Sequence, residues 1–255
     1  MQQLPGLAGG VALVTGGSAG IGRSSALGFA ANGARVVILD VNESGGREVV
    51  SEIEKLGIAA TFVKGDVTSE GEVQEAVDTA VRNYGRLDFA HNNAGIFGPN
   101  APITEQTLEG WSRVLDLNTT GVFLCMRAEL RVMTEQGSGA IVNTLSTAGR
   151  KGIKNIAPYV ASKFAVDGLT RSAAIEAGPF GVRVNSICPG TTRTPQYQAH
   201  VTQFPEYEAM ATAAAPLRRV GEPAEVAACA VWLCSSAASF VTGSSIYADG
   251  GILAG

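Results

Sequence analysis

Three residues near the middle of the chain have the types and the spacing of a proton-transfer site. Ser146 precedes Tyr159 by thirteen residues, and Lys163 follows Tyr159 by four. Because a separation of four on a helix places two side chains on one face, the Lys163 ammonium can lie beside the Tyr159 phenol. A cation within about 4–6 Å favours the phenolate over the phenol, whose pKa in water is about 10. The spacing therefore predicts a tyrosine that works as a general acid or base.

A glycine-rich turn near the amino end has the composition of a nucleotide-binding loop. The apolar run Val11–Thr15 predicts a buried strand, and Gly16, Gly20 and Gly22 follow it at the start of a helical pattern. Glycines let the backbone approach a pyrophosphate closely, and a helix N-terminus offers unpaired N–H groups and a positive dipole end. The spacing differs from the commoner G-x-G-x-x-G fingerprint, so a tight structural turn is the alternative.

Apolar and helical segments alternate along the chain. Runs rich in Val, Ile, Leu and Ala predict strands at Val11–Thr15, Arg35–Asp40, Ala60–Gly65, Leu87–His91, Ala140–Ser146, Val182–Cys188 and Ser245–Ala248. Helices are predicted at Gly20–Asn32, Glu43–Leu56, Ser69–Tyr84, Thr104–Asp116, Thr119–Gln136, Ala157–Ala177 and Pro223–Ser235. Nearly continuous apolar strands separated by helices are typical of a parallel sheet covered on both faces. The sequence therefore predicts one doubly wound α/β domain over residues 1–255.

One long connection, residues 190–222, breaks this alternation. Connections of this length in a compact α/β domain are commonly lids or binding loops, and ligands bind beyond the carboxyl ends of the strands. We therefore expect this segment to bind substrate, with a mainly apolar lining from Tyr197, Phe204, Tyr207 and Met210. The alternative is that these side chains only pack the loop onto the domain or serve a subunit contact.

Two carboxylates follow predicted strands at the places where a dinucleotide would lie. Asp40 ends the second strand, roughly twenty residues after the glycine turn, where a carboxylate can bind the adenosine ribose and select NAD over NADP. Neither Ala19 nor Val41 supplies the basic side chain that a 2′-phosphate would need. Asp66 follows the third strand and could contact adenine. The alternatives are a solvated carboxylate or N-cap at Asp40 and an N-cap at Asp66.

Amide and hydroxyl side chains complete the candidate site. The run Asn92–Gly95 ends the fourth strand and suits backbone contact with a cofactor, unless it only stabilises the central strands. Asn118 lies between two helical segments, where a bare kink is the alternative to a functional role. Ser146 can donate to a carbonyl oxygen or merely cap a turn. Tyr159 and Lys163 could also be an amphipathic tyrosine over a lysine that extends its ammonium to solvent.

Composition excludes several classes of protein. Of 255 residues, 45% are hydrophobic and 16% are charged, which suits a buried sheet and is unlike disorder. A net charge of −4 without a basic cluster predicts no binding to nucleic acid or to an anionic membrane. The chain shows neither a long apolar run nor a secretory signal, so a cytoplasmic protein is expected. Four cysteines without a Cys-x2-Cys pair predict buried thiols and no metal site, and His91 is expected to be a core histidine.

Taken together, these motifs resemble the short-chain dehydrogenase/reductase family across essentially the whole chain. The resemblance rests on Thr15-Gly16-x3-Gly20-Ile21-Gly22, Asp66, Asn92-Asn93-Ala94-Gly95, Asn118, Ser146, Tyr159-x3-Lys163 and Pro189-Gly190. It implies a single-domain Rossmann fold with a seven-stranded sheet, an oxidoreductase that uses NAD, and a homotetramer built on the helices with Asn118 and Tyr159 and on the last strand. It also implies that hydride passes between the nicotinamide and a secondary alcohol or ketone.

The resemblance also implies a role for each matching residue. Ser146 would position the substrate oxygen, Tyr159 would exchange the proton, and Lys163 would lower the pKa of Tyr159 and hold the nicotinamide ribose. Asn118 would hold a relay water. The cofactor would contact Gly16, Ser18, Gly20, Ile21, Gly22, Asp40, Asp66, Val67, Asn93, Ala94, Gly95, Tyr159, Lys163, Pro189, Gly190, Thr192 and Thr194. The substrate would contact Ile96, Phe97, Ser146, Ala148, Tyr159 and Tyr197. Thr192 stands where the family usually has an aliphatic residue.

Two other functions stay open at this point. An enoyl reductase or a hydratase-like relative would keep the fold, although the three-residue gap between Tyr159 and Lys163 favours carbonyl chemistry. A catalytically silent dinucleotide sensor or scaffold is the alternative from another class of protein. The intact set of catalytic residues argues against it.

Overall fold

Seven parallel strands form the centre of the protein. The computed structural model describes residues 3–254, and its strands lie in the order β3-β2-β1-β4-β5-β6-β7. Because β1 lies beside both β2 and β4, the strand order reverses there, which is the point where open α/β sheets bind ligands. The doubly wound Rossmann-type fold is confirmed. The strands are β1 Val11–Thr15, β2 Arg35–Asp40, β3 Ala60–Lys64, β4 Phe89–Asn92, β5 Gly139–Thr144, β6 Val182–Pro189 and β7 Ser245–Ala248.

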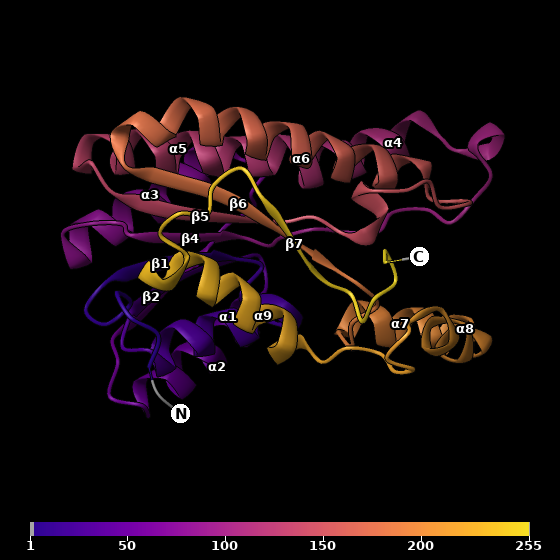
Figure 1. Cartoon of the computed structure of the whole chain (residues 1–255), viewed down its shortest axis with the longest axis horizontal. Coiled ribbons are helices and arrows are strands. Elements are labelled where there is room, and N and C mark those ends of the chain that lie inside the picture. The colour runs from indigo at the N-terminus through magenta and orange to yellow at the C-terminus, as the bar shows by residue number, and fades with distance from the viewer. Residues whose placement is uncertain (1–2, 255) are drawn as a thin grey trace.

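Helices cover both faces of the sheet (Figure 1). One face carries α1 (Gly20–Ala31), α2 (Glu43–Glu54) and α9 (Pro223–Cys234). The other carries α3 (Glu70–Tyr84), α5 (Gly121–Gln136) and α6 (Ala157–Ala177). Alternate strand residues pack into two hydrophobic cores, one under each helical layer, since successive side chains of a strand point to opposite faces. The nearly continuous apolar strands are explained by this double burial.

The predicted boundaries hold to within two residues for most elements, but the segment predicted as one helix over Thr104–Asp116 is divided. A short 3-10 turn occupies Ile103–Glu105, and α4 begins only at Leu108 and ends at Leu115. The physical reason is the N-cap Thr107, whose hydroxyl accepts a hydrogen bond from the N–H of Gly110 at 3.0 Å.

The segment 190–222 was predicted as a loop without helices, and this part of the prediction is wrong. It contains α7 (Pro195–Gln203) and α8 (Glu206–Ala214), which lie together at one end of the molecule (Figure 1). Thr194 caps α7 by accepting from the N–H of Tyr197 at 3.2 Å, and proline occupies the first helical position. Each helix buries only one residue, so the hydrophobic pattern is too weak to indicate a helix, whereas the Thr-Pro pair is a usable signal.

Candidate active site

The glycine turn after β1 leaves no room for side chains. Gly16 has a φ of +62°, and a Cβ there would lie 2.9 Å from the Cα of Ala94. A Cβ on Gly22 would lie 2.1 Å from the carbonyl oxygen of Gly16. The turn therefore presents bare backbone at the N-terminus of α1, where N–H groups and the helix dipole favour an anionic phosphate.

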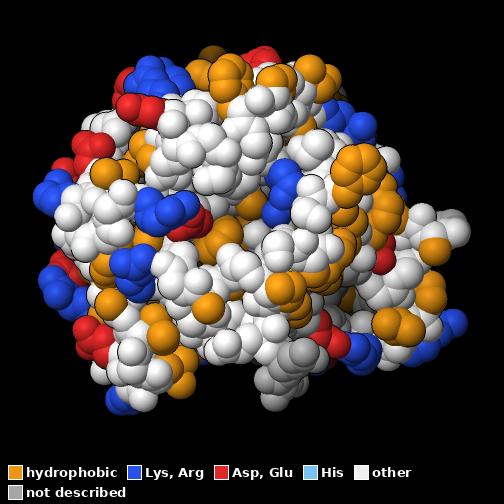
Figure 2. Space-filling view, turned by 60° about the vertical axis from the view of Figure 1, so that its left-hand side comes forward, with side chains coloured by type: hydrophobic (Ala, Val, Ile, Leu, Met, Phe, Trp, Pro, Cys, Tyr) orange, Lys and Arg blue, Asp and Glu red, His pale blue; other side chains and the backbone are white. Residues whose placement is uncertain are grey.

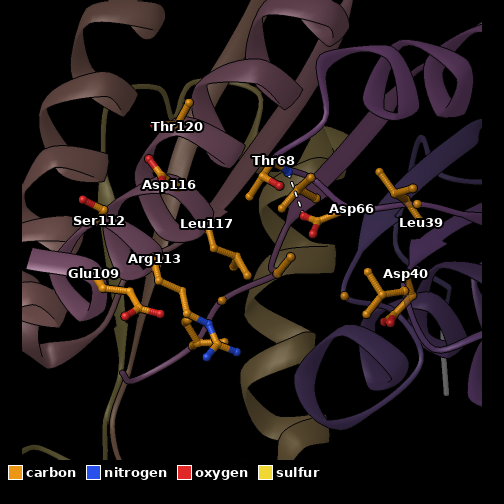
Figure 3. A pocket seen from close by; sticks show the side chains of 17 residues that line it. Leu39, Asp40, Asp66, Thr68, Glu109, Ser112, Arg113, Asp116, Leu117 and Thr120 are labelled. Atoms are coloured by element: carbon orange, nitrogen blue, oxygen red, sulfur yellow. Dashed lines mark hydrogen bonds between the residues drawn. The ribbon is translucent and has the colours of Figure 1, made fainter. Parts of the chain in front are cut away.

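A cavity of about 900 Å³ opens beside this turn, between the ends of β2 and β4 and helix α4. Figure 3 shows Asp40 and Leu39 on one side, Arg113 and Leu117 on the other, and Asp66 between them. The structure brings together these residues of the predicted cofactor and substrate sets: Gly16, Asp40, Asp66, Val67, Ala94, Gly95 and Ile96. The size, the bare turn and the carboxylate at the end of β2 fit a dinucleotide.

Sequence reasoning missed the α4 wall of this cavity. The wall is formed by Glu109, Ser112 and Arg113 of α4 and by Asp116 and Leu117 of the π-helical turn that follows it. No local motif marks these residues, because their place beside the cavity depends on how α4 crosses the ends of the strands. The wall residues are three or four positions apart, which places their side chains on one face of a helix. Only this spacing could have suggested that they act together.

Asp40 and Asp66 are both fixed by backbone N–H groups. Asp40 Oδ2 accepts from the N–H of Ser18 in the glycine turn at 3.0 Å, so the carboxylate is held directly against that turn. Asp66 Oδ1 accepts from the N–H of Thr68 at 2.9 Å. Helix α3 begins at Glu70 with Ser69 at its N-cap, so the alternative that Asp66 caps this helix is wrong.

Thr15 joins the ends of the two central strands, a role that the predicted site residues did not include. Its hydroxyl accepts from the N–H groups of Asn93 and Ala94 at 3.0 and 3.1 Å. In return the Asn93 amide donates to the carbonyl oxygens of Thr15 and Gly16 at 3.2 and 3.3 Å. These bonds hold the cavity floor, and a threonine that ends a strand before glycine is the signal that could have indicated it.

Asn118 does more than kink a helix. It is buried in a π-helical turn, Asp116–Thr120, between α4 and α5. Its side-chain oxygen accepts from the N–H of Ile96 at 2.9 Å, and its amide donates to the carbonyl oxygen of Ile96 at 2.8 Å and to Ser162 Oγ at 3.1 Å. The π turn interrupts the helix as expected, and Asn118 holds the segment after β4 against α6.

Ser146 and Tyr159 meet beside this segment. Ser146 lies two residues beyond β5 and caps the 3-10 turn Thr147–Gly149, since its hydroxyl accepts from the N–H of Ala148 at 3.1 Å. The capping role is therefore observed. The same hydroxyl also lies close enough to the Tyr159 phenol to lower its pKa, while a role of Ser146 in binding substrate stays a prediction. Tyr159 packs with Ala148, and the ring of Phe97 lies 4.7 Å from its ring, centroid to centroid. An oxygen of a substrate can be held at this pair of hydroxyls.

Lys163 lies on the same face of α6 as Tyr159 and is almost fully buried. Its ammonium donates to the carbonyl oxygen of Thr144 at 2.8 Å and lies 5.6 Å from the centre of the Tyr159 ring. Burial lowers the pKa of Lys163 to about 8. Burial also raises the pKa of Tyr159 to about 12, against the opposing effect of the Ser146 hydroxyl beside it. In this structure the depression of the Tyr159 pKa by Lys163 is therefore not seen: desolvation dominates, and the ammonium is bound to Thr144.

The remaining predicted residues lie at the end of β6 and on α7. Pro189 is the last residue of β6, and a Cβ on Gly190 would lie 2.7 Å from the Cα of Asp249. Thr192 donates to the carbonyl oxygen of Gly190 at 3.0 Å. Thr194 lies against the glycine turn, 3.2 Å from where a Cβ on Gly20 would stand. Thr194 is thus placed beside the glycine turn, while contacts of Thr192 and Thr194 with a cofactor stay predictions.

Tyr197 is buried between α7 and α8 with Ala211 and Val220, and its hydroxyl has no hydrogen-bond partner among the described residues. This placement favours the packing alternative, and its contact with substrate stays a prediction. The ring of Tyr207 on α8 lies 6.1 Å from that of Tyr197, centroid to centroid, and its phenol adds to the effects that raise the pKa of Tyr159.

A second set of buried polar residues lies behind the site. Asn92 of β4 donates to Glu129 Oε2 of α5 at 3.0 Å and to Asn143 of β5 at 3.1 Å, and all three side chains are buried between the sheet and α5. Burial raises the pKa of Glu129 to about 7. On the other face His91 is also buried and contacts Thr144 at 2.9 Å; burial lowers its pKa to about 3, so it is the neutral core histidine expected from the sequence.

We expect Glu129→Gln to change the pH dependence of stability. Because the pKa in the folded state is above that of the unfolded chain, the contribution of Glu129 to stability is complete below its ordinary pKa and is lost as the pH rises through about 7. Glutamine stays neutral at every pH. The free energy of unfolding of the Glu129→Gln variant, relative to that of the wild type, should therefore increase by about 3 kcal/mol from pH 4 to pH 8. Urea unfolding at several pH values measures this difference. The exposed Glu135→Gln on α5 is the control, and a difference that stays flat with pH would contradict the prediction.

Known proteins resemble this chain over nearly its full length. A family model described as enoyl-(acyl carrier protein) reductase matches residues 16–253. Cyclohexanol dehydrogenase of Acinetobacter sp. (strain SE19) is 43% identical over 94% of this chain and 93% of its own. 3-alpha-(or 20-beta)-hydroxysteroid dehydrogenase of Mycobacterium tuberculosis is 43% identical over 98% of this chain and 91% of its own. The crystal structure of NAD+-bound xylitol dehydrogenase superposes with a TM-score of 0.93, at 35% identity over 96% of this chain and 100% of its own. The chain therefore belongs to the short-chain dehydrogenase/reductase family and is an oxidoreductase for secondary alcohols and ketones.

Proposed function

We propose that the protein transfers a hydride between NAD and a mainly apolar secondary alcohol or ketone. The observation that carries the proposal is the placement of the Ser146 hydroxyl beside the Tyr159 phenol, next to Ile96, which also lines the cavity at the glycine turn and Asp40. When bound, the nicotinamide supplies the site that accepts or gives the hydride. The protein's own residues supply position and proton transfer.

Each residue of the site has a distinct task in this proposal. Ser146 holds the substrate oxygen by a hydrogen bond. Tyr159 takes the alcohol proton during oxidation, or gives it to the carbonyl oxygen during reduction, as a general base or acid. Lys163 places a positive charge beside Tyr159 and holds the cofactor ribose. Asn118 fixes Ile96 through its backbone and keeps the floor of the site in place.

The preference for NAD rests on the geometry at Asp40. Its carboxylate is bonded to the glycine turn through Ser18, and Val41 beside it lines the cavity without a basic group. A ribose hydroxyl can donate to the carboxylate, whereas a 2′-phosphate would meet a like charge. The relative whose crystal structure contains NAD+ supports the same cofactor class.

We also propose a homotetramer that forms through α5, α6 and the region of β7. Large apolar side chains of α5 and α6 are exposed, namely Phe123, Phe164 and Ile175, and so is Tyr247 of β7. Figure 2 shows hydrophobic side chains gathered in a band on one face, while acidic and basic side chains are interspersed over the rest of that face. Exposed apolar patches of this kind favour association between subunits. No helix among residues 3–254 is long and apolar enough to span a membrane, and the cytoplasmic location stays a prediction.

The alternatives have less support. The relatives named above act as dehydrogenases, and the three-residue gap between Tyr159 and Lys163 is retained, which disfavours an enoyl reductase despite the description of the family model. A silent dinucleotide sensor would not need a serine hydroxyl placed beside the Tyr159 phenol. Turnover of any alcohol by the purified protein would exclude the sensor.

We expect apolar secondary alcohols to be better substrates than hydrophilic ones. The reacting hydroxyls are bordered by Ile96, Phe97 and Ala148, and an apolar wall stabilises a ligand by roughly 25 cal/mol for each Å² of hydrocarbon surface that it buries. The experiment compares kcat/KM for cyclohexanol, an aryl secondary alcohol, a polyol and a hydroxy acid, with absorbance of the reduced nicotinamide as the signal. A higher kcat/KM for the polyol or the hydroxy acid would contradict the apolar site and direct attention to Arg193, the only Lys or Arg between Pro189 and Ala215.

A further inference from the structure

An ion pair joins the turn after Ser146 to the helix that carries Tyr159. Arg150 directly follows the 3-10 turn Thr147–Gly149, and Asp167 lies on α6, one helical turn beyond Lys163. Arg150 Nη1 and Nη2 donate to Asp167 Oδ2 and Oδ1, each at 2.7 Å. The two side chains are only 18% and 14% exposed. Such a two-pronged pair fixes orientation as well as distance.

Two serines of the sheet anchor the same pair. Ser245 of β7 donates to Asp167 Oδ1 at 3.1 Å and accepts from Arg150 Nη2. Ser186 of β6 lies 2.7 Å from Ser245, Oγ to Oγ. The pair therefore connects the turn, α6 and the last two strands, and a network of several bonds resists displacement more than a single contact does.

The turn transmits this constraint to the reacting groups because it lies directly on α6. A Cβ on Gly149 would lie 3.2 Å from the carbonyl oxygen of Lys163. Ala148 is fully buried against Tyr159, and its N–H donates to Ser146 Oγ. A shift of the turn must therefore move the Ser146 hydroxyl relative to that of Tyr159.

We infer that Arg150 and Asp167 are positioning residues that set the distance between the Ser146 and Tyr159 hydroxyls. The inference rests on the proposed function of these two hydroxyls. Neither Arg150 nor Asp167 needs to touch substrate or cofactor, so their loss should lower the rate and leave cofactor binding unchanged. A misplacement of about 1 Å in a reacting geometry can cost on the order of 100-fold in rate.

The first test compares Arg150→Met with Arg171→Met. Arg171 donates to the same carboxylate at 2.9 Å, but it is 55% exposed and lies on α6 itself, so it does not connect to the turn. With the best secondary alcohol we expect Arg150→Met to lower kcat by about 10- to 100-fold and to keep the Kd for NAD within about twofold, while Arg171→Met keeps both. Arg150→Lys keeps the positive charge but not the two-pronged contact with Asp167, so its kcat should lie between those of Arg150→Met and Arg171→Met. A folded Arg150→Met variant with more than half of the wild-type kcat would overturn the inference.

The second test is a double-mutant cycle with Ser146→Ala. If Arg150 acts through Ser146, Arg150→Met should slow the Ser146→Ala enzyme by no more than about threefold, because the hydroxyl it positions is already absent. If the double variant instead loses kcat by the product of the two single effects, the inference is overturned. Should Arg150→Met fail to fold, Arg150→Lys and Ser245→Ala carry the same cycle. If the wild type turns over an alcohol and the Arg150 variants do so equally well, only this inference is overturned. If the wild type is inactive with every alcohol and ketone, the proposed function is overturned as well.

Discussion

Tyr159→Phe is expected to lower kcat by about 10²- to 10⁴-fold, while the Kd for NAD stays within about twofold of the wild-type value. A general acid or base typically contributes a factor of this size, and in the proposed function the Tyr159 hydroxyl also binds the substrate oxygen together with Ser146. Phenylalanine keeps the ring that packs against Ala148 and Phe97, so the cavity and the fold should be preserved. Steady-state kinetics at saturating alcohol and a fluorescence titration with NAD measure the two quantities.

A matched control for this substitution is Tyr84→Phe. Tyr84 ends α3, and its hydroxyl lies 2.8 Å from that of Thr61, far along the chain from the active site. Its loss should leave kcat within about twofold, since it touches no reacting group. A Tyr159→Phe enzyme that keeps more than about a tenth of the wild-type kcat would refute the assignment of Tyr159 as the proton-transfer group.

The second large effect is expected in the choice of cofactor. Because the Asp40 carboxylate would oppose the 2′-phosphate of NADP, kcat/KM should be at least about 100-fold higher with NAD, which corresponds to about 3 kcal/mol. Asp40→Ser removes the negative charge and should reduce this ratio by at least about tenfold, mainly through improved use of NADP. The measurement is kcat/KM for both cofactors with one alcohol.

Asp66→Asn serves as the control for cofactor choice. Asp66 lines the same cavity and is likewise bonded to a backbone N–H, but it follows β3 rather than the strand end beside the glycine turn. It should change the Kd for both cofactors together and leave their ratio within about threefold. Comparable kcat/KM values of the wild type with NAD and NADP would contradict the role of Asp40.

The alternation of apolar and helical segments was enough to predict the fold. Strands buried on both faces must be apolar throughout, so Val11–Thr15 and Val182–Cys188 are visible in the sequence without any tertiary information. The helices α7 and α8 were not predicted, because each buries a single residue and so lacks the periodic pattern on which such predictions depend.

What the sequence determined by itself about the site was the set of residues with local spacing. The four-residue step from Tyr159 to Lys163, the glycine turn and the carboxylate at Asp40 each depend on one element and its ends. The structure places Gly16 and Asp40 around one cavity and Tyr159 against Ile96, which lines the same cavity. Their chemistry follows from residue type and short-range geometry, which are encoded in neighbouring positions.

Only the tertiary structure decided the features that depend on contacts between distant segments. The wall made by Arg113 and Leu117, the bond from Asn118 to Ile96, and the pair between Arg150 and Asp167 each join elements whose relative placement no local pattern contains. The pKa of Tyr159 was misjudged for the same reason. It depends on how much solvent the packed elements exclude around the phenol, and burial here outweighs the nearby cation.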